Sequence, residues 1–127
     1  MNLEERTQPA RVHAWLEARR SDPAAAAMLA FEQQLPRVWD AKVLPYVDTG
    51  PDDGIRFADA LEGQYLSRGE RVLVTLAANL WRGGEFLVDV SDLAYLDDAW
   101  LPAALHMIDA YVGGRALRGY VPSLQEG

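Results

Sequence analysis

Residues 67–84, SRGERVLVTLAANLWRGG, carry the clearest helical pattern in the chain. Ser67 followed by Glu70 matches a capping box, in which the serine oxygen accepts the amide of the third helical residue and the glutamate side chain accepts the serine amide. The glycine pair at the end of the stretch permits the positive φ with which many helices close. The sequence therefore predicts a helix over residues 68–82.

The apolar side chains of this helix cover an arc of roughly 200°, which is wider than the arc of about 100° that a surface helix needs. The arc consists of Val72, Leu73, Val74, Leu76, Ala77, Leu80 and Trp81. A helix with so broad an apolar face has to contact neighbours on at least two sides. We therefore expect it to be the central helix of the fold.

Five further helices are predicted around the central one, so we expect an all-α fold in a single domain. Their ranges are 9–20, 23–35, 36–45, 55–62 and 99–112. Pro9 and Pro23 suit the first turns of their helices, because the amide that proline lacks would have no partner there. Residues 85–90, EFLVDV, are expected to be extended, as a linker or as half of a small hairpin. Residues 1–8 and 119–127 are expected to be flexible.

The composition is that of a small acidic domain. Half of the 127 residues are hydrophobic, which is enough for a core without disulfides, and the absence of cysteine excludes thiolate metal sites and thiol nucleophiles. The N-terminus does not resemble a secretory signal, and no apolar run approaches the roughly 20 residues of a membrane span. We expect a soluble cytoplasmic protein that does not associate with membranes.

The net charge of −7 is unevenly distributed along the chain. No Lys or Arg occurs between Arg82 and Arg115, whereas several acidic residues do. Binding to a nucleic-acid backbone depends on clustered Lys and Arg, so we do not expect direct contact with nucleic acid. A protein with a basic surface, such as a nucleic-acid-binding protein, is the expected partner.

Four acidic residues after the central helix form the candidate partner-binding site: Asp89, Asp92, Asp97 and Asp98. Some of them also suit helix caps, with Ser91 and Asp92 before a single turn and Asp97 with Asp98 before the last helix. A paired-carboxylate catalytic site is another interpretation, but capping and surface charge explain these residues without catalysis. We therefore expect a non-enzymatic interaction protein: an inhibitor, an antitoxin-like protein or an accessory subunit.

The alternative function is a small metal-dependent hydrolase that uses His106, Asp109 and nearby acids. His13 and Glu17 form a similar pair, one helical turn apart. A solvent-exposed histidine beside a helical neighbour explains each pair without a metal, because no second histidine lies near in the sequence. Whether the two histidines meet in space stays open. We assign no catalytic residue, metal or cofactor.

Two other charged groups have simple structural explanations. The loop over residues 48–54, DTGPDDG, contains several aspartates but does not match the register of an EF-hand, so we expect a solvated turn. Arg68, Arg71 and Arg82 form a stripe on the central helix, and we expect them to pair with the acidic segment inside the fold. The four tryptophans leave a homo-oligomer open, if one small core does not cover them.

The helical stretch, followed by the run DVSDLAYLDD and another amphipathic helix, resembles a recurring arrangement in small uncharacterised bacterial or phage helical proteins. The likeness covers residues 66–112 and consists of an S-x-G-E-x-x-L start and an L-W-x-G close. It implies a helical protein of bacterial or phage origin, and it implies no activity.

Overall fold

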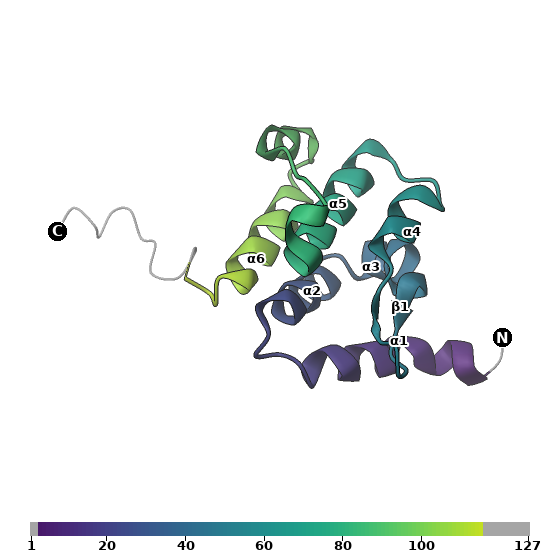
Figure 1. Ribbon diagram of the computed structural model, residues 1–127. Coiled ribbons are helices and arrows are strands. Elements are labelled where there is room, and N and C mark those ends of the chain that lie inside the picture. Colours follow the sequence, from purple (N-terminus) through teal and green to yellow (C-terminus); the bar gives the residue numbers. More distant parts are fainter. Residues whose placement is uncertain (1–2, 116–127) are drawn as a thin grey trace.

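The computed structural model describes the backbone of residues 3–115 and the side chains of residues 8–115. The α-helices of this part of the chain are α1 (Leu3–Glu17), α2 (Pro23–Gln34), α3 (Pro36–Lys42), α4 (Phe57–Glu62), α5 (Arg68–Arg82) and α6 (Leu101–Tyr111) (Figure 1). The short 3-10 helices are η1 (Leu44–Tyr46), η2 (Gly83–Glu85) and η3 (Val90–Tyr95). A small antiparallel hairpin pairs β1 (Val47–Asp48) with β2 (Gly54–Ile55). The all-α prediction is confirmed.

The predicted central helix is α5, and both of its ends are as expected. The Ser67 amide donates to Glu70 Oε1 at 2.8 Å, and the Glu70 amide donates to Ser67 Oγ at 3.2 Å, which completes the capping box. Gly83 closes the helix with a φ of 70°. The helix contacts α2, α3, α4, α6 and η3. Its broad apolar arc explains this number of neighbours, because a single contact would leave half of the arc in water.

The most extensive contact between two helices joins α2 to α6. Alanines make this close packing feasible: Ala25 and Ala27 of α2 and Ala103 and Ala104 of α6 are all buried. A methyl side chain keeps the two backbones close together and loses no rotamer freedom on burial. Larger side chains, including Met28 and Phe31, fill the space between this pair and the other helices.

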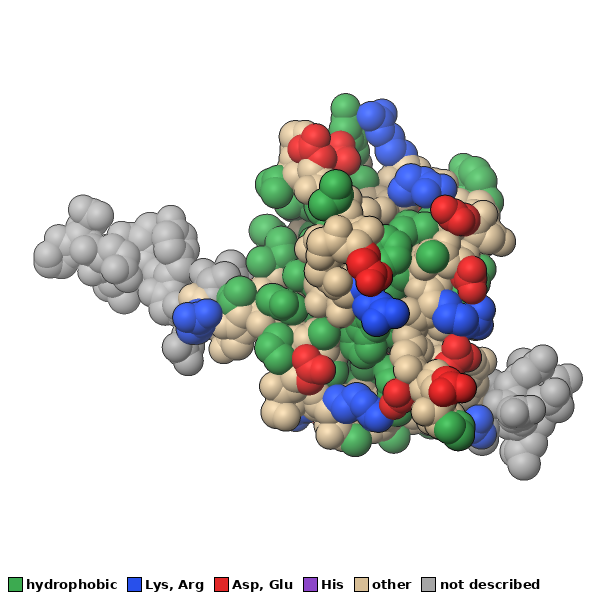
Figure 2. Space-filling model, viewed as in Figure 1, with side chains coloured by type: hydrophobic (Ala, Val, Ile, Leu, Met, Phe, Trp, Pro, Cys, Tyr) green, Lys and Arg blue, Asp and Glu red, His purple; other side chains and the backbone are tan. Residues whose placement is uncertain are grey.

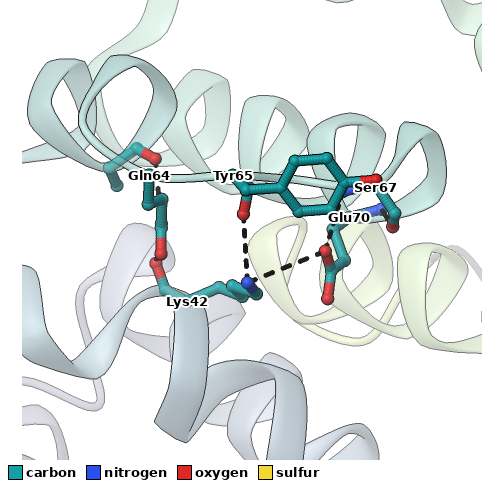
Figure 3. Close-up of polar contacts among 6 residues, drawn as sticks. Lys42, Gln64, Tyr65, Ser67 and Glu70 are labelled. Atoms are coloured by element: carbon teal, nitrogen blue, oxygen red, sulfur yellow. Dashed lines mark hydrogen bonds and ion pairs between the residues drawn. The ribbon is translucent and has the colours of Figure 1, made fainter.

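A group of polar contacts ties α3 to the N-terminus of α5 (Figure 3). Lys42 Nζ donates to the Tyr65 carbonyl at 3.0 Å and lies 4.0 Å from Glu70 Oε1. Gln64 Nε2 donates to the carbonyls of Lys42 and Ala60 at 2.8 and 2.9 Å. Glu70 Oε1 therefore accepts the Ser67 amide in the capping box and also faces the ammonium group of Lys42.

Two local predictions are wrong in the first half of the chain. Pro9 lies inside α1 and not in its first turn, because the helix begins at Leu3. A proline removes a single backbone hydrogen bond, so the turns on both sides of it can be helical. Ile55 was expected to be helical but lies in β2, where it pairs with Val47. Both side chains are buried, and this long-range contact outweighs the local helical spacing.

The segment after α5 is extended over a shorter range than predicted, and it forms no strand. Glu85 ends η2, the backbone of Phe86 and Asp89 is extended, and Val90 already begins η3. The Asn79 side chain holds this linker in place by donating to the Phe86 carbonyl at 2.7 Å. The predicted flexible residues 119–127 lie outside the described residues. No helix in the described part of the chain is long and apolar enough to cross a membrane.

Candidate functional site

The candidate site is the acidic segment, which we define as residues 87–98, between the end of α5 and the start of α6. Figure 1 shows η3 at the edge of the fold, beyond the ends of the two helices. None of residues 87–95 is fully buried, and Leu96 is the first buried side chain of the segment. The segment contains all four predicted partner-binding residues.

Two of these four acids accept backbone amides: Asp89 caps η3, and Asp97 caps the turn that precedes α6. Asp89 Oδ1 accepts the Ser91 amide at 3.0 Å and the Ser91 hydroxyl at 2.7 Å, so Asp89 caps η3 in place of the predicted Ser91 and Asp92. Asp97 Oδ1 accepts the amides of Ala99 and Trp100, each at 2.9 Å, just before α6. The hydroxyl of Ser91, and then its amide, lower the pKa of Asp89 below the ordinary value of 3.8. Asp89 therefore keeps its negative charge while it caps.

The other two acids have no capping role. Asp98 is exposed, and it makes no hydrogen bond or ion pair with any described residue. Asp92 is half-buried and lines a small groove between the acidic segment and α5. Charge reversal at these two positions would alter the surface without removing a cap.

The acidic segment also carries large apolar side chains in contact with solvent. Leu87, Val90 and Tyr95 are 83%, 73% and 53% exposed. They were not predicted as site residues. The signal was present in the sequence, since an extended chain alternates its faces: Phe86 and Val88 pack against the core, and Leu87 points away from it.

The groove beside the acidic segment has a volume of about 290 Å³. Arg68 and Arg71 of α5 line it, facing Asp89 and Asp92, but no ion pair within 4.0 Å joins these described side chains. The Arg68 guanidinium instead stacks on the Tyr95 ring at 3.5 Å, and Arg71 Nη1 donates to the Leu61 carbonyl at 3.3 Å. The expected pairing of the arginine stripe with acidic residues is therefore wrong for Arg68 and Arg71, whereas Arg82 lies 3.8 Å from Glu85. One of the carboxylates is already engaged as a cap, and the arginines find other contacts.

A larger cavity of about 560 Å³ shares no lining residue with this groove, and we call it the hairpin cavity. Its walls come from α1, the β1–β2 hairpin, the start of α4 and the end of α5. Four aromatic side chains contribute to them: Trp15, Phe57, Trp81 and Phe86. Figure 2 shows hydrophobic atoms in a hollow on this face, with acidic and basic side chains around it.

Charged side chains surround the aromatic walls of the hairpin cavity. Six are carboxylates: Asp22, Asp48, Asp52, Asp53, Asp59 and Glu85. Three are arginines: Arg19, Arg56 and Arg82. At neutral pH the lining therefore has a net charge of −3. The sequence did not predict this cavity, because its walls come from parts of the chain that only the tertiary fold brings together.

The histidines do not form a metal site with described residues. His13 Nε2 lies 3.7 Å from Glu17 Oε1, its predicted neighbour. His13 Nδ1 also lies 2.6 Å from Oε1 of Glu32 in α2, a contact that was not predicted. His106 is exposed on α6, and Asp109 is half-buried. Within residues 8–115, no three His, Cys, Asp or Glu side chains are grouped so that they could hold a metal ion.

Comparison of the chain with protein-family models, with curated proteins and with solved structures finds no match. The resemblance to bacterial or phage helical proteins stays a prediction. The function has to be argued from the surface described above.

Proposed function

We propose that the protein is a non-enzymatic interaction protein that binds a basic surface of another protein through its acidic segment. An inhibitor, an antitoxin-like protein or an accessory subunit would act in this way. A nucleic-acid-binding protein would offer a suitable surface, because its Lys and Arg are clustered to meet phosphates.

The observation that carries the proposal is the mixture of side chains on the acidic segment. Leu87, Val90 and Tyr95 are exposed within nine residues of one another, and the four acids lie between and beside them. Protein interfaces combine an apolar centre with a polar rim, and their charges set the choice of partner and the rate of encounter. A solvated surface without a partner has no need for three large apolar side chains so close together.

The hydrolase alternative has no comparable observation in its favour. It needs His106 and Asp109 to share a site with further ligands, and the described residues contain no such group. We therefore design the experiment around the interaction surface.

The test compares the wild-type protein with the double variant Asp92→Lys/Asp98→Lys. A tagged wild-type chain should capture one discrete protein from the organism that encodes it, and the affinity is then measured with that protein in purified form. We expect the double variant to weaken binding about tenfold or more, because two favourable charges become repulsive. Asp89 and Asp97 stay unchanged, so the cap of η3 and the capped turn before α6 remain, and the circular dichroism should not change.

The matched control is Asp40→Lys/Glu62→Lys, which makes the same change in net charge on exposed positions of α3 and α4. This control should bind the partner as the wild type does. A second variant, Leu87→Ser/Val90→Ser, should weaken binding without any change in charge. Equal losses in the control and in the Asp92/Asp98 variant would show that only net charge matters, and the proposed site would then be wrong.

A further inference from the structure

We propose that the hairpin cavity is a binding site for a small organic cation, an ammonium or amidinium group attached to a flat apolar body. This inference is independent of the proposed protein partner, because the cavity shares no lining residue with the groove beside the acidic segment. It rests on the size of the cavity, on its aromatic walls and on how its charges are paired.

The size and the walls suit a small molecule. About 560 Å³ lies within the range of roughly 300–1,000 Å³ that is usual for ligand sites in proteins. The Trp15 and Trp81 rings are 5.8 Å apart and tilted by 41°, and the Phe57 and Phe86 rings meet edge to face at 6.4 Å. Trp81 and Phe86 are half-buried and offer the apolar surface that a flat ring can contact, whereas Trp15 and Phe57 are 9% and 1% exposed and support them from the core.

The arginines of the cavity are already neutralised by carboxylates. Arg19 Nη2 lies 2.6 Å from Asp53 Oδ2, and the same oxygen accepts the Trp15 indole at 3.1 Å. Arg56 reaches both Asp48 and Asp59, at 3.0 and 3.1 Å.

Arg82 lies 3.8 Å from Glu85. No arginine of the lining is therefore left without a carboxylate among the described residues, and an anion would have to displace one. The cavity consequently disfavours phosphates and carboxylates as ligands.

The carboxylates of the cavity, in contrast, are in excess. Asp52, at the tip of the hairpin, makes no hydrogen bond or ion pair with any described residue. Asp22 accepts the Ala24 amide at 3.0 Å as the cap of α2, and it has no cationic partner among the described residues. A cation in the cavity would meet uncompensated negative charge beside aromatic faces, and both attract it.

The protein itself shows that a cation suits this wall. The Arg19 guanidinium lies over the Trp15 ring, 4.6 Å from its centroid. A ligand amidinium would extend the same arrangement towards Trp81 and Phe86, and its apolar body would cover surface that is now wet.

The experiment uses benzamidine as the probe and benzoate as its control, because the two have the same shape and opposite charge. The indole signals of Trp15 and Trp81 report on the cavity in NMR spectra, whereas Trp39 and Trp100 do not line it. We expect benzamidine to shift the Trp15 and Trp81 signals saturably, with a dissociation constant on the order of millimolar. Benzoate should leave them unchanged.

Two variants with the same change in charge locate the effect. Asp52→Asn removes the unpaired carboxylate of the cavity and should weaken benzamidine binding about fivefold. Asp98→Asn removes an equally unpaired carboxylate of the acidic segment and should leave the affinity unchanged. Neither substitution breaks a contact with a described side chain, so both variants should fold.

The proposal is overturned if benzamidine gives no saturable shift, if benzoate shifts the same signals equally, or if Asp98→Asn weakens binding as much as Asp52→Asn. N-acetylarginine methylamide separates the two sources of such a cation, a free small molecule and the side chain of a protein. Tighter binding of benzamidine supports the free molecule, because its ring meets the aromatic walls. Tighter binding of the arginine derivative would overturn that assignment and indicate a peptide ligand.

Discussion

Asp89 joins a structural role and a surface charge in one side chain. Its carboxylate caps η3 through Ser91 and still contributes to the negative potential of the acidic segment. The other capping acid, Asp97, does the same at the start of α6. A cap does not remove a charge from the surface, because amide and hydroxyl donors stabilise the ionised form of the carboxylate. The two interpretations of these acids, as caps and as a charged surface, are therefore compatible.

The lowered pKa of Asp89 predicts how acid affects this cap. Because the folded chain holds the pKa below 3.8, the cap contributes stability above the pKa of the unfolded chain and loses it as the pH falls through the folded value. Ser91→Ala removes the hydroxyl donor, so we expect the pKa of Asp89 to rise towards 3.8. NMR titration of the carboxyl group measures this directly. Ser21→Ala is the control, and an unchanged midpoint in Ser91→Ala would contradict the assignment.

At the scale of the elements, α5 follows its local pattern and α6 does so only in part. Leu105 and Tyr111 are large apolar residues of α6, but they are 41% and 40% exposed, whereas Ala103 is 1% exposed. The reason is the partner helix. The most extensive contact of α6 is with α2, and α6 buries Ala103, Ala104 and Met107; at about 100° per residue, Leu105 falls on the other side of the helix from this face.

This difference predicts the effect of two identical substitutions. Leu76 of α5 is 5% exposed, so Leu76→Ala should lower the free energy of unfolding by about 2–5 kcal/mol. Leu105→Ala in α6 should cost less than about 1 kcal/mol, because much of that side chain is already in water. Urea denaturation of the two variants measures both values. Similar losses would mean that α5 is not the central helix.

Across the whole molecule, burial is concentrated in the helices and is low in the acidic segment. The core includes side chains from all six α-helices, whereas none of residues 86–95 is buried. No tryptophan is among the exposed apolar side chains, because all four are buried or half-buried. The tryptophans therefore give no reason of their own to expect a homo-oligomer, which stays a prediction.

The uneven burial predicts uneven protection of the backbone amides. In native-state hydrogen exchange, amides of α2 and α5 should be the last to exchange, and those of η3 should exchange well before them. The physical reason is that η3 has no fully buried side chain and only Leu93 of it packs against the core, so its opening exposes little apolar surface. Amides of η3 that exchange as slowly as those of α5 would contradict this expectation. A bound partner on the acidic segment should slow them, and the amides of the β1–β2 hairpin serve as the internal control.

The sequence by itself determined the ends of α5, the broad apolar arc that makes it central, and the position of the acidic segment. Capping boxes, terminal glycines and apolar periodicity act within one or two helical turns, so they can be read without the fold. The charge pattern also singled out the four acids of the proposed site, although the sequence did not divide them into two capping and two free carboxylates.

Only the tertiary structure decided which apolar side chains stay in water and where the cavities lie. Ile55 joins a hairpin because Val47 lies opposite it, and Leu105 is exposed because α6 turns Ala103, Ala104 and Met107 towards the core. The hairpin cavity combines Trp15, Asp52 and Trp81, which are far apart in the sequence. Their proximity depends on the packing of all the helices at once, and local patterns carry no information about such distances.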